Sequence, residues 1–221
     1  TGNILVDYTL FGFEDTVVHE PEESTKSIKS TEKEPAEPEP KEDSPEVSGV
    51  SSFISQIYPA AKRLYETAEG LHPLFVTAQA ALETGWKIKK TGNNIFGITK
   101  GSWTGATNLL LTTEILDTPD KQFTLPEKIV SVEPLASGKY RYSVYRLFRA
   151  YASIDECIED HFTLLKGSLY KYAWEYRNDP REYARQIAPV YATSPDYANT
   201  LVAVIEMVER NVREYENLKI S

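Results

Sequence analysis

The stretch Pro73-Leu-Phe-Val-Thr-Ala-Gln-Ala-Ala-Leu-Glu83-Thr-Gly-Trp86 decides the fold. From Leu74 to Leu82 all but two residues are apolar, and a helix that is apolar nearly all round lies inside a protein. Proline favours the first turn of a helix, and glycine favours the position just after its end. The sequence therefore predicts a buried central helix that begins at Pro73 and ends before Gly85.

Glu83 falls in the last turn of this predicted helix. The negative end of the helix macrodipole and poor solvation both disfavour an ionised carboxylate at that position. A carboxyl group that stays protonated near neutral pH can act as a general acid. A glutamate near a helix end is more often a solvated residue without a chemical task, so the interpretation depends on its neighbours.

The neighbours of Glu83 form a recognisable signature. The run that contains Glu83 is followed by Asn93-Asn94-Ile-Phe96-Gly97-Ile98, and together they resemble the signature of glycoside hydrolase family 73. This family comprises endo-N-acetylglucosaminidases of bacterial cell walls, among them flagellar-rod peptidoglycan hydrolases, autolysins and phage lysins, with a lysozyme-like fold. The resemblance spans roughly residues 51–215 and implies that Glu83 is the general acid. It also implies that peptidoglycan glycan strands are the substrate, and that no metal or organic cofactor takes part.

A second carboxylate is expected because glycosidases commonly place two of them around the bond that is cut. Thr112-Thr113-Glu114 matches the Thr-Thr-Glu of the family's β-lobe, which implies that Glu114 stabilises positive charge or activates water. The flanking sequence departs from the family, since Ile115 stands where an aromatic residue often follows. A longer excursion then passes through Asp117 and Asp120, and either of these acids is an alternative second carboxylate.

A third block, Tyr191-Ala-Thr-Ser-Pro195-Asp-Tyr197, resembles the family's Tyr-Ala-Thr-Asp-Pro motif, with Ser194 in place of the aspartate. The resemblance implies that Tyr191 lies at the active site, where a phenol could orient the substrate amide or a water molecule. The alternative is a core tyrosine at the start of the last helix, because buried tyrosines commonly pair their hydroxyl groups locally.

Five further residues are candidates for binding substrate: Trp86, Asn94, Phe96, Trp103 and Tyr197. Aromatic residues lie more often in a core than in a cleft. We expect Trp86 and Trp103, which are flanked by glycine or polar residues, to form cleft walls, and we expect the Phe96 and Tyr145 rings to pack in the core.

The order of helical and strand patterns predicts an α+β fold. Apolar residues recur at helical spacing from Phe53 onward, and helix-start signals occur at Ser153, Asp179 and Ser194. Between them lie three strand-like segments: 107–116, 128–133 and 139–150. The sequence therefore predicts a lysozyme-like helical body with a small antiparallel β-lobe and a substrate cleft between the two.

The chain divides into three parts by composition. Residues 1–18 hold a short apolar patch that is either an anchor on a larger assembly or a flap on the main domain. Residues 19–50 are rich in Glu, Lys, Ser and Pro, which predicts a disordered linker. Residues 51–221 are the predicted glucosaminidase domain.

Charge and residue usage exclude several classes of protein. Residues 1–50 contain thirteen acidic residues and four lysines, a balance of −9 that equals the net charge of the whole chain. No basic surplus remains for nucleic-acid binding. Cys157 is expected to be a buried structural thiol, and the three histidines are too scattered to suggest a metal site. No apolar run is long enough for a membrane span, and no signal peptide is visible.

Two alternatives to the glucosaminidase hypothesis stay open from the sequence. One is a muramidase or lytic transglycosylase on the same fold, which would cut the other glycosidic bond. The other is an inactive wall-binding or virion structural module. The expected location is the cell wall, the extracellular space or a phage particle, where an endolysin-like enzyme meets its substrate.

Overall fold

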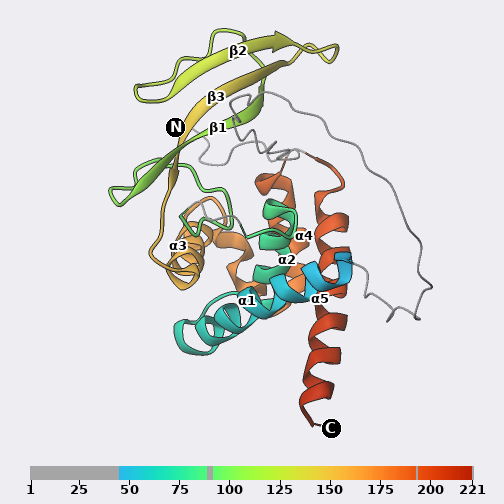
Figure 1. The fold of residues 1–221 in the computed structure, drawn as a ribbon. Helices are drawn as coiled ribbons and strands as arrows, with labels where there is room; N and C mark the ends of the chain where they lie inside the picture. Colours follow the sequence, from blue (N-terminus) through green and yellow to red (C-terminus); the bar gives the residue numbers. More distant parts are fainter. Residues whose placement is uncertain (1–44, 89–91, 193, 221) are drawn as a thin grey trace, which may run out of the picture.

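The computed structural model describes residues 45–88, 92–192 and 194–220, and it places a bundle of helices beside a small sheet (Figure 1). The helices are α1 (Pro45–Ala68), α2 (Pro73–Thr84), α3 (Ile154–Lys166), α4 (Pro180–Tyr191) and α5 (Tyr197–Ile220), with a 3₁₀ helix η1 (Lys171–Tyr176). The strands are β1 (Thr107–Leu116), β2 (Lys128–Pro134) and β3 (Tyr140–Arg149). The predicted α+β fold, a helical body with an antiparallel β-lobe, is confirmed.

Helix α2 occupies the centre of the body and packs against α1, α4 and α5 (Figure 1). It begins at Pro73, where the preceding His72 ring nitrogen accepts a hydrogen bond from the Leu74 amide at 3.2 Å. It ends at Gly85, which adopts the left-handed conformation with φ 59° that a glycine tolerates best. Every residue from Pro73 to Ala81 is buried, as the sequence predicts.

Helix α1 begins earlier than expected, at Pro45 and not near Ser51. Proline suits the first turn of a helix because its missing N–H would have no partner there, and Val50 packs against the core. Helix α1 thus extends six residues into the segment 19–50 that was expected to be linker. The predicted anchor, residues 1–18, and the rest of the predicted linker, residues 19–44, lie outside the described residues.

The later helix starts agree with the sequence signals at two of three positions. Ser153 caps α3 by accepting a hydrogen bond from the Glu156 amide, and Asp179 caps α4 in the same way. Helix α5 begins at Tyr197, three residues after the start signal at Ser194.

The sheet has the order β1-β3-β2, and Glu114 of β1 lies opposite Tyr142 of β3. Both side chains point to the face that the loop 117–127 covers. The Tyr142 hydroxyl donates to the Thr118 carbonyl at 2.8 Å and accepts from the Lys121 amide at 3.1 Å. The loop therefore closes this face of the sheet and buries Glu114, which is 3% exposed.

Backbone hydrogen bonds join the sheet to the helical body where β3 ends. Thr99 forms an isolated bridge with Phe148, and the Arg149 amide donates to the Ile98 carbonyl at 2.9 Å. The Tyr151 amide donates to the Gly92 carbonyl at 2.8 Å. The loop that follows α2 is thus fixed to the base of the β-lobe.

Two buried groups of α3 lie in the core beneath this loop. Cys157 is fully buried, as expected for a structural thiol, and burial raises its pKa to about 12. His161 is 2% exposed and stacks on Phe96 with ring centroids 3.8 Å apart, and burial lowers the pKa of its imidazole to about 3. Within the part of the chain that the structure describes, no helix is long and apolar enough to cross a bilayer.

Candidate active site

Glu83 stands in the last turn of α2, at the end of the helix that faces the sheet in Figure 1. Part of its side chain is accessible, yet the apolar surroundings still desolvate the carboxyl group. This desolvation raises the pKa of Glu83 to about 8. The acid is therefore protonated at neutral pH and has a proton to donate.

Tyr191, the last residue of α4, lies beside Glu83. Its hydroxyl donates to the Glu83 carboxyl oxygen Oε1 at 3.4 Å, a hydrogen bond that opposes the effect of burial on the Glu83 pKa. The Tyr191 side chain is 4% exposed. The structure thus brings together two of the residues that the sequence predicts to be catalytic, although 108 positions separate them.

Tyr197, at the start of α5, completes this side of the site. Its ring stacks on that of Tyr191 with centroids 5.4 Å apart and planes 22° apart. The Gln79 amide, one helical turn before Glu83, donates to the Tyr197 hydroxyl at 3.2 Å. Three helices therefore contribute side chains to one cluster around Glu83.

Glu114 is held inside the β-lobe by a charged group. Its carboxylate pairs with Arg146 of β3, which also donates to Glu127 at 2.9 Å and lies over the Phe123 ring. Burial raises the pKa of Glu114, while the Arg146 charge and hydrogen bond act in the opposite direction. Glu114 is thus a desolvated carboxylate with a compensating cation.

The two alternative acids lie in a different environment. Asp117 is 87% exposed at its side chain and pairs with Lys139 at 3.6 Å. Asp120 is also exposed. Both acids are therefore open to solvent, whereas Glu114 is buried.

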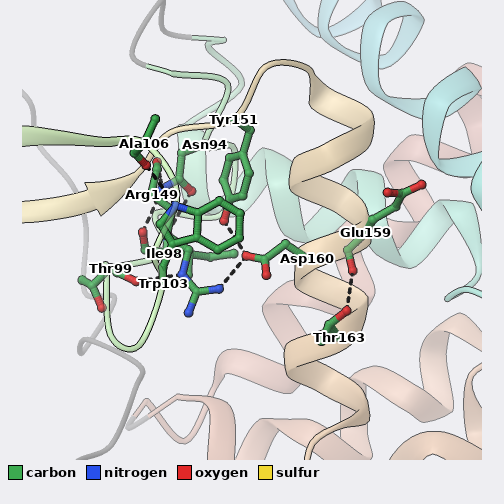
Figure 2. Close-up of polar contacts among 10 residues, drawn as sticks. All are labelled: Asn94, Ile98, Thr99, Trp103, Ala106, Arg149, Tyr151, Glu159, Asp160 and Thr163. Carbon is green, nitrogen blue, oxygen red and sulfur yellow. Dashed lines mark hydrogen bonds and ion pairs between the residues drawn. The ribbon is translucent and has the colours of Figure 1, made fainter.

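Asn94 was expected to bind substrate, but its amide is used to hold the loop after α2. Its Nδ2 donates to the carbonyls of Ile98 and Arg149, both at 2.9 Å, and its Oδ1 accepts from the Ile98 amide at 2.9 Å (Figure 2). Both ends of the amide are paired with backbone, so Asn94 supports the shape of this loop, and its contact with substrate stays a prediction.

Behind this loop lies a buried ion pair that fixes the base of β3 to α3 (Figure 2). Arg149 is 5% exposed and donates to Asp160 of α3 at 2.6 Å, and the Tyr151 hydroxyl donates to the same oxygen at 2.7 Å. Arg149 also donates to the Thr99 carbonyl at 3.2 Å. Loop, strand and helix therefore meet at one charged cluster.

The aromatic candidates divide between core and surface. Phe96 is 1% exposed and packs in the core, so it cannot stack on a sugar, and its place among the substrate-binding candidates is wrong. Tyr145 was expected in the core, but it is 39% exposed because it points away from the covered face of the sheet.

Both tryptophan side chains are partly exposed. Trp86 packs edge-on against Phe53, with ring centroids 5.6 Å apart. The Trp103 indole donates to the Ala106 carbonyl at 3.0 Å, and its ring lies beside Arg149 and Tyr151. Each ring is fixed on one side by the protein and keeps some surface for a ligand.

In residues 45–88, 92–192 and 194–220, no group of three or more His, Cys, Asp or Glu side chains is placed to bind a metal ion. The raised pKa of Glu83 and the Tyr191 phenol beside it suit proton transfer.

A protein-family model described as mannosyl-glycoprotein endo-beta-N-acetylglucosaminidase matches residues 58–210, more than half of the chain. The chain belongs to the glucosaminidase family. The resemblance that the sequence blocks around Glu83, Glu114 and Tyr191 indicate is thereby confirmed at the level of the family.

The chain is similar to curated proteins that are named as peptidoglycan hydrolases or glucosaminidases. The chain is 28% identical over 172 residues to the peptidoglycan hydrolase FlgJ of Pseudomonas aeruginosa, covering 73% of this chain and 38% of the relative. It is 30% identical to the peptidoglycan hydrolase FlgJ of Vibrio parahaemolyticus, and the match covers 76% of this chain and 48% of the relative. It is 29% identical to the exo-glucosaminidase LytG of Bacillus subtilis, and the match covers 80% of this chain and 57% of the relative. The chain thus spans less than two thirds of the length of these relatives.

A solved structure supports the fold. The C-terminally truncated glycoside hydrolase domain of FlgJ from Salmonella typhimurium aligns with a TM-score of 0.52 at 23% identity, covering 73% of this chain and 98% of that domain. The described helices and the three-stranded sheet therefore have the fold of that domain.

Several residues of this glucosaminidase domain were missed by the sequence analysis. Arg146, Arg149 and Asp160 form the charged pairs that fix the β-lobe, and Gln79 supports Tyr197. Their signal in the sequence is a charged or polar residue at a position whose neighbours predict burial. Such a signal shows that a partner is needed, but it does not show which partner.

Proposed function

We propose that this chain is a peptidoglycan hydrolase that cleaves the β-1,4 bond after N-acetylglucosamine. The observation that carries the proposal is Glu83, an acid with a pKa of about 8 that accepts a hydrogen bond from Tyr191 inside a glucosaminidase-family domain. Relatives named peptidoglycan hydrolases support the substrate class. The expected place of action is the cell wall.

In this mechanism Glu83 donates its proton to the oxygen of the leaving sugar as the glycosidic bond breaks. Water adds to the anomeric carbon of the other sugar and gives its proton to Glu114, or directly back to the ionised Glu83 where Glu114 only stabilises charge, so one new reducing end forms. Glu114 is the second carboxylate of the proposal, and it stabilises positive charge or activates water. Tyr191 orients the reacting sugar, and Trp86 and Trp103 are the proposed stacking surfaces.

The test is digestion of purified peptidoglycan, borohydride reduction and mass analysis of the products. Reduced glucosamine at the new ends is the expected result. Reduced muramic acid would indicate a muramidase, and 1,6-anhydromuramic ends would indicate a lytic transglycosylase. One relative is named an exo-glucosaminidase, so the length of the products is measured as well. Long fragments early in the digestion would support endo cleavage. Release of terminal sugars alone would indicate exo cleavage.

The second carboxylate has its own prediction. Glu114→Gln is expected to lower kcat by at least about tenfold, whereas Asp117→Asn and Asp120→Asn are expected to stay within about twofold of the parent. Burial and the Arg146 pair favour Glu114, while both aspartates are exposed. Wall-lysis kinetics and thermal unfolding are measured on the same preparations. A larger loss for either aspartate would move the second carboxylate to that residue.

Residues 1–44 are proposed to tether the domain, with the apolar patch within residues 1–18 as the contact to a virion or a multidomain parent. The acidic, proline-rich composition of residues 19–44 gives little apolar surface to bury against the domain. Deletion of residues 1–44, which leaves α1 whole, is therefore expected to keep kcat on soluble wall fragments within about twofold. A loss greater than tenfold would show that the segment takes part in catalysis.

A further inference from the structure

Gln79 is a buried amide in the helix that carries Glu83. It is fully buried, and from Pro73 to Ala81 the only other polar side chain belongs to Thr77. Gln79 and Glu83 are four residues apart, so their side chains lie on the same face of α2, one turn from each other.

The contacts of Gln79 lead back to Glu83 by a second route. Its amide nitrogen donates to the Tyr197 hydroxyl at 3.2 Å, and the Tyr197 ring stacks on Tyr191. The Tyr191 hydroxyl in turn donates to Glu83 at 3.4 Å. A chain of three contacts therefore runs from α2 through α5 and α4 and returns to α2 at Glu83.

Packing alone gives no reason for an amide at this position. The carbonyl oxygen of the Gln79 side chain has no hydrogen-bond partner among the described residues. An apolar side chain of the same length would fill the space without leaving a buried acceptor unpaired. Residues that break the rules of core packing are expected where function requires them.

We propose that Gln79 is a positioning residue, which holds Tyr197 against Tyr191 so that the Tyr191 phenol stays on Glu83. The inference rests on the proposed role of Glu83 as the general acid. It assigns no contact with the substrate to Gln79.

The test compares Gln79→Met, which keeps the length of the side chain and removes both polar atoms, with Tyr197→Phe, which removes only the hydroxyl. Both variants are expected to lower kcat about tenfold with KM within about twofold, and the double variant is expected to be no worse than either single one. Thermal stability of Gln79→Met is expected to equal or exceed that of the parent. Losses that multiply in the double variant would contradict a shared contact.

A matched control comes from Thr77, whose hydroxyl is also fully buried and without a hydrogen-bond partner among the described residues. It lies two residues before Gln79 and therefore on the other side of α2. Thr77→Val is expected to keep the parental kcat. A loss equal to that of Gln79→Met would mean that any change of buried polarity in α2 disturbs the site, and the proposal would fail.

A readout without substrate separates this proposal from the proposed function. The Glu83 carboxyl is titrated by NMR in protein labelled with ¹³C-glutamate, and Glu83→Gln assigns its signal. Since the Tyr191 hydrogen bond lowers the Glu83 pKa, loosening it in Gln79→Met should move the midpoint upward by about half a unit or more. If the chain cleaves no peptidoglycan, the proposed function fails, and this shift still tests the positioning role. An unchanged midpoint in both Gln79→Met and Tyr197→Phe would overturn it.

Discussion

Glu83→Gln is expected to lower kcat on peptidoglycan by about 10²–10⁴-fold while the fold is kept. Glutamine retains the shape and can accept the Tyr191 hydrogen bond, but it has no proton to give to the leaving sugar. Lysis rates and near-UV circular dichroism of the purified variant check both statements. Glu66→Gln, on the exposed side of α1, is the matched control and should behave as the parent does. Activity of Glu83→Gln within threefold of the parent would remove Glu83 from the mechanism.

The pKa of about 8 gives the same variant a second, opposite effect. Glu83 is protonated in the folded state up to about pH 8, whereas in the unfolded chain it ionises above its ordinary value of 4.5. The stability that this group contributes is thus fully present below pH 4.5 and is lost as the pH rises through 8. At pH 7, Glu83→Gln is expected to raise the free energy of unfolding by about 1–3 kcal/mol. Urea unfolding at pH 4 and pH 7 measures this, and the gain should disappear at pH 4.

The parental activity should follow the same ionisation. Because only protonated Glu83 is a general acid, kcat/KM is expected to fall about tenfold per pH unit above pH 8. A rate that stays constant to pH 10 would show that another group supplies the proton.

Much of this fold follows from local signals in the sequence. Pro73 and Gly85 set the limits of α2, and the β-branched and aromatic runs set β1 at 107–116 and β3 within one residue of its expected ends. These signals work because they act through the backbone of the residues that carry them. The early start of α1 at Pro45 was missed because the composition around it resembles a linker, although a proline fits a first helical turn.

The site was less predictable than the fold. Glu83 could be argued from helix position and burial, but its partner Tyr191 came only from the family resemblance, since 108 residues separate the two. The role of Asn94 depends on which backbone groups surround it, and the exposure of Tyr145 depends on which face of the sheet the loop 117–127 covers. The hydrogen-bond partners of Asn94 and the exposure of Tyr145 both depend on tertiary packing, and they cannot be predicted from a single sequence.

The second large effect is expected at the ion pair between Arg149 and Asp160. Asp160→Ala should lower the free energy of unfolding by about 3–5 kcal/mol, because it leaves a buried guanidinium without its carboxylate. The total free energy of unfolding of a typical domain is only about 5–15 kcal/mol. The exposed pair between Arg63 and Asp155, which also joins α3 to another segment at 2.7 Å, is the control. Asp155→Ala should cost about 1 kcal/mol or less, because solvent screens that pair. Urea unfolding of the three proteins measures the difference.

A double variant shows whether the charge or the packing is responsible. Replacing both partners, Arg149→Met with Asp160→Leu, removes the unpaired charge, so it should be less destabilising than Asp160→Ala alone. If the double variant is worse, the contribution comes from the Arg149 contacts to the Thr99 carbonyl and Trp103, and not from the charge pair. The pair fixes the base of β3, so loosening it should also misplace Glu114 relative to Glu83. The double variant should stay folded without the charge pair. We therefore expect a clear loss of kcat in this variant even though its free energy of unfolding falls less than that of Asp160→Ala.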